Sequence, residues 1–265
     1  MVRRNPRPAF RTRFHRTSIG EDGFSLLEMM IALAILTVVI GVAVDGLTQM
    51  QHRDLAEQSK TDTVQETRDF VDQMVRDLHD VGYPPRVVFV NKPNCAGLFW
   101  VSCSLIYFSS TEIRYEGDLD GTGTVYRVIM QLVPPASGKC PCILQRGVID
   151  KNSALAGNVP TYYTEVNGVL NSGDGAGGST YGTDLPGPGS YSSYTTSNVF
   201  DAYDVNAVPV GTCIDATSCA SIDSLQITVN VASKSADLKT GIYSVYSMTS
   251  KARVNNAQDD GGIIP

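Results

Sequence analysis

Residues 23–45 read GFSLLEMMIALAILTVVIGVAVD, and this stretch decides how the rest of the chain is interpreted. From Met29 to Val44 the only polar side chain is that of Thr37. As an α-helix, the span from Phe24 to Val44 is about 32 Å long, which matches the hydrocarbon thickness of a bilayer. The stretch therefore predicts a helix, residues 24–45, that crosses a membrane once.

Basic residues are concentrated before the apolar stretch. Six arginines precede it, namely Arg3, Arg4, Arg7, Arg11, Arg13 and Arg16. The flank beyond it opens with Asp45 and carries mixed charge. The positive-inside rule therefore predicts a single-pass membrane protein with its N-terminus in the cytoplasm and everything after Asp45 outside.

The cysteines agree with this orientation. All six lie beyond the apolar stretch, at Cys95, Cys103, Cys140, Cys142, Cys213 and Cys219. An even number of cysteines in an exported domain indicates disulfides. Short spacing in the sequence favours two disulfides that close local loops, Cys95–Cys103 and Cys213–Cys219. Cys140 and Cys142 are then the remaining pair. Disulfides that cross between these pairs stay an alternative.

The exported part is acidic. The whole chain has 21 basic and 27 acidic residues, and residues 1–23 hold six arginines, Glu21 and Asp22, so the remainder carries a formal charge of −10. Nucleic acids and anionic lipids require a positive surface. The sequence therefore indicates no nucleic-acid binding.

The boundary before the apolar stretch differs from that of an ordinary secretory signal. Such a signal is cleaved at small residues after its apolar segment, and no such site follows Val44. Instead Glu28 stands inside the apolar run, where a carboxylate is costly and is functional by default. The string GFSLLE at residues 23–28, followed by an uncharged apolar helix, resembles the type IV prepilin family.

This resemblance implies a processing pathway and a set of partners. Residues 1–23 would be a leader, cut by prepilin peptidase between Gly23 and Phe24, and the same enzyme would N-methylate Phe24. Glu28 would take part in assembly with other major and minor pilins through the N-terminal helix. The subunit would then leave the inner membrane for a pilus at the cell surface. A plain signal anchor is the alternative, but it leaves Gly23-Phe24 unexplained.

Beyond the membrane segment the apolar pattern becomes that of an amphipathic helix. Apolar or uncharged residues recur at three- and four-residue steps, at Val64, Thr67, Val71, Met74, Val75, Leu78 and Val81. No proline interrupts residues 24–83, Gly82 suits a helix end, and Pro84-Pro85 stops any continuation. We therefore expect residues 46–83 to extend the first helix.

Residues 84–265 have the pattern of an exported β-sheet head. Segments rich in β-branched and aromatic residues predict strands at 87–90, 105–109, 125–133, 143–150, 225–231 and 244–254. Residues 151–220 are rich in Gly, Ser, Tyr, Thr and Asn, which predicts a long irregular loop region. The expected class is α+β: one long N-terminal helix packed on a mostly antiparallel sheet, as in pilins.

Looser matches narrow the resemblance to minor pilins of the PilW type. They are residues 76–83 (RDLHDVGY), 107–109 (YFS), 118–121 (DLDG) and 251–255 (KARVN). The J-type minor pseudopilin of type II secretion has a similar plan and is the alternative. A membrane-anchored enzyme or binding protein is a third hypothesis, which predicts no cleavage between Gly23 and Phe24.

One loop resembles the first half of a calcium site. Asp118, Asp120 and Thr122 provide alternate oxygen ligands, and the intervening glycines permit a turn. The acidic residue that closes an EF-hand is missing, because Ile129 stands in its place. A tight hairpin turn between residues 113–115 and 125–127 explains the same residues. Calcium is the only cofactor that the sequence suggests.

Other motifs do not indicate catalysis. Residues 173–178 (GDGAGG) fit G-x-G-x-x-G, but no strand and helix are predicted around them. Cys140-Pro141-Cys142 has one intervening residue, whereas redox pairs normally have two. The three histidines, His15, His52 and His79, all precede the sheet region, so no His-based catalytic site is expected there.

Overall fold

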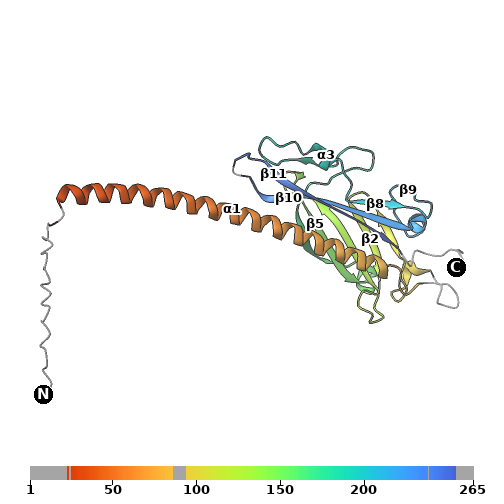
Figure 1. Cartoon of the computed structure of the whole chain (residues 1–265). Coiled ribbons are helices and arrows are strands. Elements are labelled where there is room, and N and C mark those ends of the chain that lie inside the picture. The colour runs from red at the N-terminus through yellow and green to blue at the C-terminus, as the bar shows by residue number, and fades with distance from the viewer. Residues whose placement is uncertain (1–22, 24, 86–93, 238, 255–265) are drawn as a thin grey trace, which may run out of the picture. The chain divides into compact units, whose positions relative to one another are not determined.

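The computed structural model describes residues 23, 25–85, 94–237 and 239–254. The chain divides into two units, Met1–His52 and Arg53–Pro265. One 55-residue helix, α1 (Leu26–Asp80), contributes to both units (Figure 1). The expected strand at 87–90 and the leader up to residue 22 lie outside the described residues.

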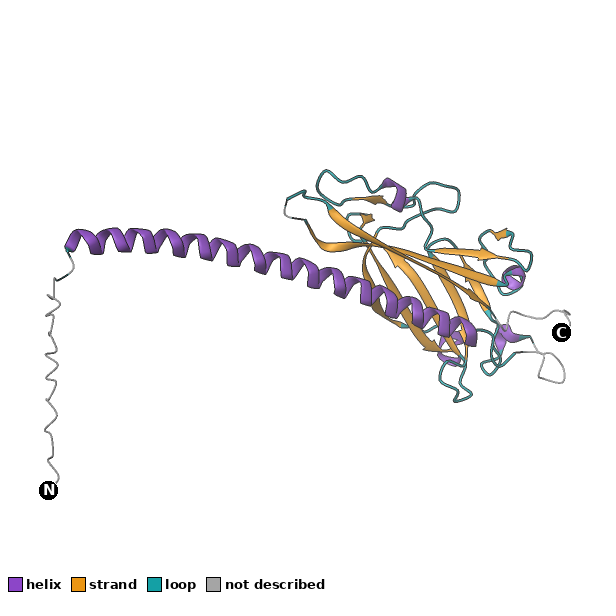
Figure 2. Ribbon diagram, in the orientation of Figure 1, coloured by secondary structure: helices purple, strands orange, loops and turns teal. Residues whose placement is uncertain are grey.

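The second unit contains a nine-stranded sheet, which Figure 2 shows in orange. Its strands are β1 (Leu105–Phe108), β2 (Glu112–Gly117), β3 (Tyr126–Val133), β5 (Cys142–Asp150), β6 (Thr161–Val169), β8 (Phe200–Tyr203), β9 (Pro209–Val210), β10 (Ser224–Ala236) and β11 (Tyr243–Arg253). Their order is β1-β2-β3-β5-β6-β10-β8-β9, with β11 paired to β10, and every pairing is antiparallel. The expected α+β, pilin-like fold is confirmed.

Short helices and strands lie in the connections between the strands of the main sheet. They are η2 (Cys95–Gly97), β4 (Lys139–Cys140), α2 (Lys151–Leu155), β7 (Gly182–Thr183), α3 (Ser192–Thr195) and η3 (Ser218–Ser221). Strands β4 and β7 form a separate two-stranded parallel sheet.

The C-terminal half of α1 packs on the sheet through one stripe. Its buried residues are Thr63, Thr67, Phe70, Val71, Met74, Asp77 and Leu78, which recur at three- and four-residue steps. The apolar ones join the core with alternate residues of β3, including Val128, Met130 and Leu132. The periodicity in the sequence predicted this stripe, but Thr63, Phe70 and Asp77 were not among the predicted positions.

The end of α1 is fastened to β2. Val81 forms an antiparallel bridge with Gly117, and the N–H of Gly82 donates to the carbonyl of Glu116 at 2.8 Å. A Cβ atom on Gly117 would lie 2.5 Å from the carbonyl oxygen of Asp80, so only glycine permits this approach. Gly82 itself has φ 84°, which reverses the chain after the helix.

A buried polar network joins α1 to the strands. Asp77 Oδ2 accepts hydrogen bonds from the Tyr115 hydroxyl at 2.8 Å and from Arg146 Nη2 at 2.6 Å. Burial, followed by the charge of Asp77, raises the pKa of Tyr115 well above its ordinary value. The network fixes the helix in register on β2 and β5, because each partner comes from a different element.

The segment 151–220 is more regular than its composition suggests. It supplies β6, which pairs with β5, and β8, which pairs with β10. Strand β6 escapes sequence analysis because half of its residues are polar and Gly168 (φ 77°) interrupts it. The expectation of an irregular loop was therefore wrong for Thr161–Val169 and Phe200–Tyr203.

Candidate functional site

The start of α1 brings together the residues that the sequence singles out. The backbone N–H groups of Glu28 and Met29 donate to the carbonyl of Ser25 at 2.9 and 3.1 Å, which starts the helix. Glu28 lies in the first turn, where the helix dipole favours a carboxylate. Gly23 is exposed and has open space around it, whereas Phe24 lies outside the described residues.

An apolar surface covers this part of α1 on every side. All side chains from Ser25 to Met50 are exposed, including Leu26 (79%) and Val42 (71%). Thr37 donates its hydroxyl to the carbonyl of Leu33 at 2.7 Å, so even this polar group is satisfied within the helix. By length and composition the helix can cross a membrane. A helix that is apolar all round requires lipid or other helices as its surroundings.

The structure pairs the six cysteines into three disulfides. The pairs are Cys95–Cys103, Cys140–Cys142 and Cys213–Cys219, with Cα–Cα distances of 5.2, 4.3 and 5.3 Å. All six side chains are buried in the head. Each pair closes a local loop, so the disulfides stiffen loops and do not join distant elements.

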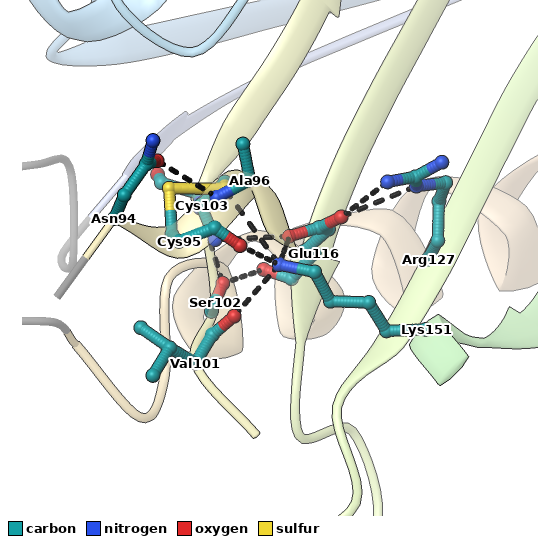
Figure 3. The surroundings of a disulfide bond; sticks show 10 residues. Asn94, Cys95, Ala96, Val101, Ser102, Cys103, Glu116, Arg127 and Lys151 are labelled. Atoms are coloured by element: carbon teal, nitrogen blue, oxygen red, sulfur yellow. Dashed lines mark hydrogen bonds and ion pairs between the residues drawn. A yellow bond between two sulfur atoms is a disulfide. The ribbon is translucent and has the colours of Figure 1, made fainter. Parts of the chain in front are cut away.

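A buried ion pair supports the Cys95–Cys103 loop, as Figure 3 shows. Lys151 Nζ lies 2.5 Å from Glu116 Oε2 and donates to the carbonyls of Cys95 at 2.8 Å and Val101 at 2.7 Å. Glu116 Oε1 also accepts from Arg127 Nη2 at 2.8 Å.

Burial decides the electrostatics of this pair, since both side chains are fully buried. Desolvation lowers the pKa of Lys151, and the neighbouring Glu116 opposes that shift. The cluster holds the loop in place and offers no open position for a substrate. Sequence reasoning missed it because Glu116 lies in β2 and Lys151 begins α2, 35 residues further along the chain.

The candidate calcium ligands lie together in the turn between β2 and β3. Asp118 Oδ2 accepts from the N–H of Gly123 at 2.8 Å. Asp120 Oδ1 accepts from the hydroxyl of Thr122 at 2.7 Å. Thus the hairpin turn is formed, and the three residues predicted as ligands are neighbours within it.

The other motifs take structural roles. In the turn at residues 173–178, Asp174 Oδ1 accepts from the N–H groups of Ala176 at 2.8 Å and Gly178 at 2.9 Å. A dinucleotide site requires a strand before the glycines and a helix after them, and neither flanks this turn directly. His52 and His79 both lie on α1, away from any cysteine pair in sequence.

Comparison with known proteins adds one finding, at the N-terminus. The family model described as the prokaryotic N-terminal methylation motif matches residues 20–44. No curated protein and no solved structure matches the chain significantly. The motif coincides with the start of α1 and with its exposed apolar surface. Together these features support a type IV prepilin-like protein, a pilin or pseudopilin, that is anchored in a membrane and processed by a prepilin peptidase.

Proposed function

We propose that the chain is a minor type IV pilin of the PilW type. Residues 1–23 are its leader, which prepilin peptidase removes before methylating Phe24. Before assembly the mature subunit is anchored in the inner membrane with its head in the periplasm, and it is then incorporated into a pilus. The observation that carries this proposal is the methylation motif at residues 20–44, which includes the first part of α1, where every side chain is exposed.

The charge distribution and the cysteines support the topology. Six arginines precede the apolar segment, and all six cysteines follow it. Disulfides persist in oxidising compartments, so three local pairs in the head fit a periplasmic and later extracellular location.

Glu28 has a role in assembly under this proposal. Its carboxylate is exposed in the first turn of α1, among apolar side chains. In a packed filament such a group is surrounded by apolar helices, where an unpaired charge is expensive. The methylated amine of a neighbouring Phe24 neutralises it and sets the axial register between subunits.

The variant Glu28→Gln tests this role, because it keeps the shape of the side chain and removes its charge. We expect normal cleavage and membrane insertion but a strong loss of incorporation into filaments, measured by immunoblot of sheared pili. Asp45→Asn is the matched control, since Asp45 is an exposed carboxylate on the same helix. Normal incorporation of the Glu28→Gln subunit would refute the proposed role.

The same N-terminal motif also fits a J-type minor pseudopilin of type II secretion. The two functions differ in partners, so crosslinking from cysteines placed at exposed positions such as Val38 and Val42 separates them. Crosslinks to pilins of a retractable pilus support the proposal. Crosslinks only to pseudopilins, with loss of secretion in a deletion strain, would replace it with the secretion function.

A further inference from the structure

The turn between β2 and β3 has an unusual buried carboxylate. Residues 118–125 read DLDGTGTV, and the sequence leaves β2 at Gly117 and enters β3 at Tyr126. Asp118 is only 6% exposed, whereas Asp120 is exposed. The N–H of Asp118 donates to the carbonyl of Tyr83 at 2.9 Å, which fixes the base of the turn beside the end of α1.

One oxygen of Asp118 has no partner. Oδ2 accepts from the N–H of Gly123, but Oδ1 is buried without any hydrogen bond. Within the described residues, the only other buried side-chain nitrogen or oxygen atoms without a hydrogen-bond partner are Ser59 Oγ and Arg146 Nε. A buried carboxylate oxygen without a partner is costly, and such an atom calls for a bound ion or water.

A second carboxylate lies close to the first. Asp120 Oδ2 accepts from the Tyr126 hydroxyl at 2.9 Å. In the described part of the chain, neither aspartate has an ion-pair partner. Two adjacent carboxylates without a cation repel each other.

The backbone of the turn brings oxygen atoms to one place. Gly121 and Gly123 have φ values of 69° and 84°, which other residues rarely adopt. Glycine at the sixth position of the turn lets its N–H hold one oxygen of the first aspartate and leaves the other oxygen free. Residues 118, 120 and 122 hold the first, third and fifth positions, from which calcium loops draw side-chain ligands, and the Thr122 hydroxyl lies 2.7 Å from Asp120 Oδ1.

We propose that this turn binds one calcium ion. Its ligands are Asp118 Oδ1, the carboxylate of Asp120, the hydroxyl of Thr122 and the carbonyl of Thr124, with water in the remaining positions. The described residues contain no group of three or more His, Cys, Asp or Glu side chains able to hold a metal, so the site carries only two negative charges. Its dissociation constant should therefore fall in the range of extracellular modules, about 10⁻⁴–10⁻³ M.

Magnesium fits the site poorly. It demands near-ideal octahedral geometry at short distances and gives up its water reluctantly, whereas calcium tolerates the irregular ligands of a turn. A bound ion would neutralise Asp118 and stiffen the junction between this turn and the end of α1. The head should therefore unfold at a higher temperature with calcium than with magnesium.

The test uses the full chain in detergent, stripped with EGTA and titrated with calcium chloride or magnesium chloride at matched ionic strength. We expect saturable calcium binding by calorimetry, and a rise of a few degrees in the unfolding temperature at about 10 mM calcium. Asp118→Asn should lower the calcium affinity by at least about tenfold, because it removes one of the two charges on the ion.

Asp174→Asn is the matched control, since Asp174 is an exposed turn aspartate that accepts two backbone N–H groups. It should bind calcium as the unmodified chain does. Three results would each overturn the proposal: no binding at 10 mM calcium (~10 times the weakest expected dissociation constant), equal effects of calcium and magnesium, or unchanged binding in Asp118→Asn. Any of these results would mean that Asp118 Oδ1 accepts a hydrogen bond from a water molecule and does not bind calcium.

Discussion

In α1, every side chain from Leu26 to Met50 is exposed, whereas Phe70, Met74 and Leu78 are buried against the sheet. The first region is apolar on all sides, and the second confines its apolar residues to one stripe. The difference indicates two kinds of surroundings for one helix. The second region obtains its partner from this chain, while the first must find lipid or other subunits.

The strongest contrast is expected between two methionines on the same helix. Met74 is fully buried and Met30 is 62% exposed. Met74→Ala should destabilise the head by about 2–5 kcal/mol, through lost burial and the cavity left behind. Met30→Ala should leave head stability unchanged. Denaturant unfolding followed by the fluorescence of Trp100, the single tryptophan, measures both. Equal effects would break the comparison.

A charge placed in each region sharpens the comparison further. Val39→Asp puts a carboxylate at the centre of the apolar region, which costs about 2.5–3.5 kcal/mol in a membrane helix. We expect a reduced membrane-bound fraction and no entry into filaments. Gln65→Asp adds the same charge at an exposed position of the second region and should have no effect. Membrane fractionation compares the two, and retention of Val39→Asp at normal levels would contradict the account.

Two aspartates on α1 should also differ. Asp77 is buried and binds Tyr115 and Arg146, so Asp77→Asn should lower the free energy of unfolding by about 1.5–3 kcal/mol, as expected for charged hydrogen bonds. Asp45→Asn should leave head stability unchanged, because Asp45 is exposed. If both substitutions proved neutral, the network would not hold α1 on the sheet.

The smallest effect is expected for Tyr115, whose contribution to the same network depends on alkaline pH. Tyr115→Phe removes one hydrogen bond and should cost about 1 kcal/mol at neutral pH. The folded pKa of Tyr115 is raised, so its contribution is fully present below the unfolded value of about 10 and is lost as pH rises above it. Denaturant unfolding measured from pH 9 to 11, a range around the ordinary tyrosine pKa of ~10, should show that the free energy of unfolding falls less steeply with pH in the variant than in the unmodified chain. If the free energy of unfolding fell equally steeply in both proteins, Tyr115 would not cause the loss of stability at alkaline pH.

Local patterns made much of the fold predictable. The apolar run and the later three- and four-residue spacing predicted α1, and segments rich in β-branched and aromatic residues predicted β1, β3, β5, β10 and β11. Strands β6 and β8 could not be predicted, since their polar residues become strand only through pairing with β5 and β10.

The candidate site divides in the same way. Gly23, Phe24 and Glu28 lie within one six-residue string, so a local motif identifies them. The buried pair of Glu116 and Lys151 depends on how β2 and the start of α2 are placed in the fold, and no local pattern indicates it. Likewise, the free oxygen of Asp118 is visible only in the folded turn.

The N-terminus of the mature protein tests the central claim most directly. Mass spectrometry of protein purified from membranes of cells with active prepilin peptidase should find a chain that begins with N-methylated Phe24. Such a result would place the first region of α1 at the start of the mature subunit, ready to pack with other subunits. An intact leader, or an N-terminus at any other residue, would contradict the account.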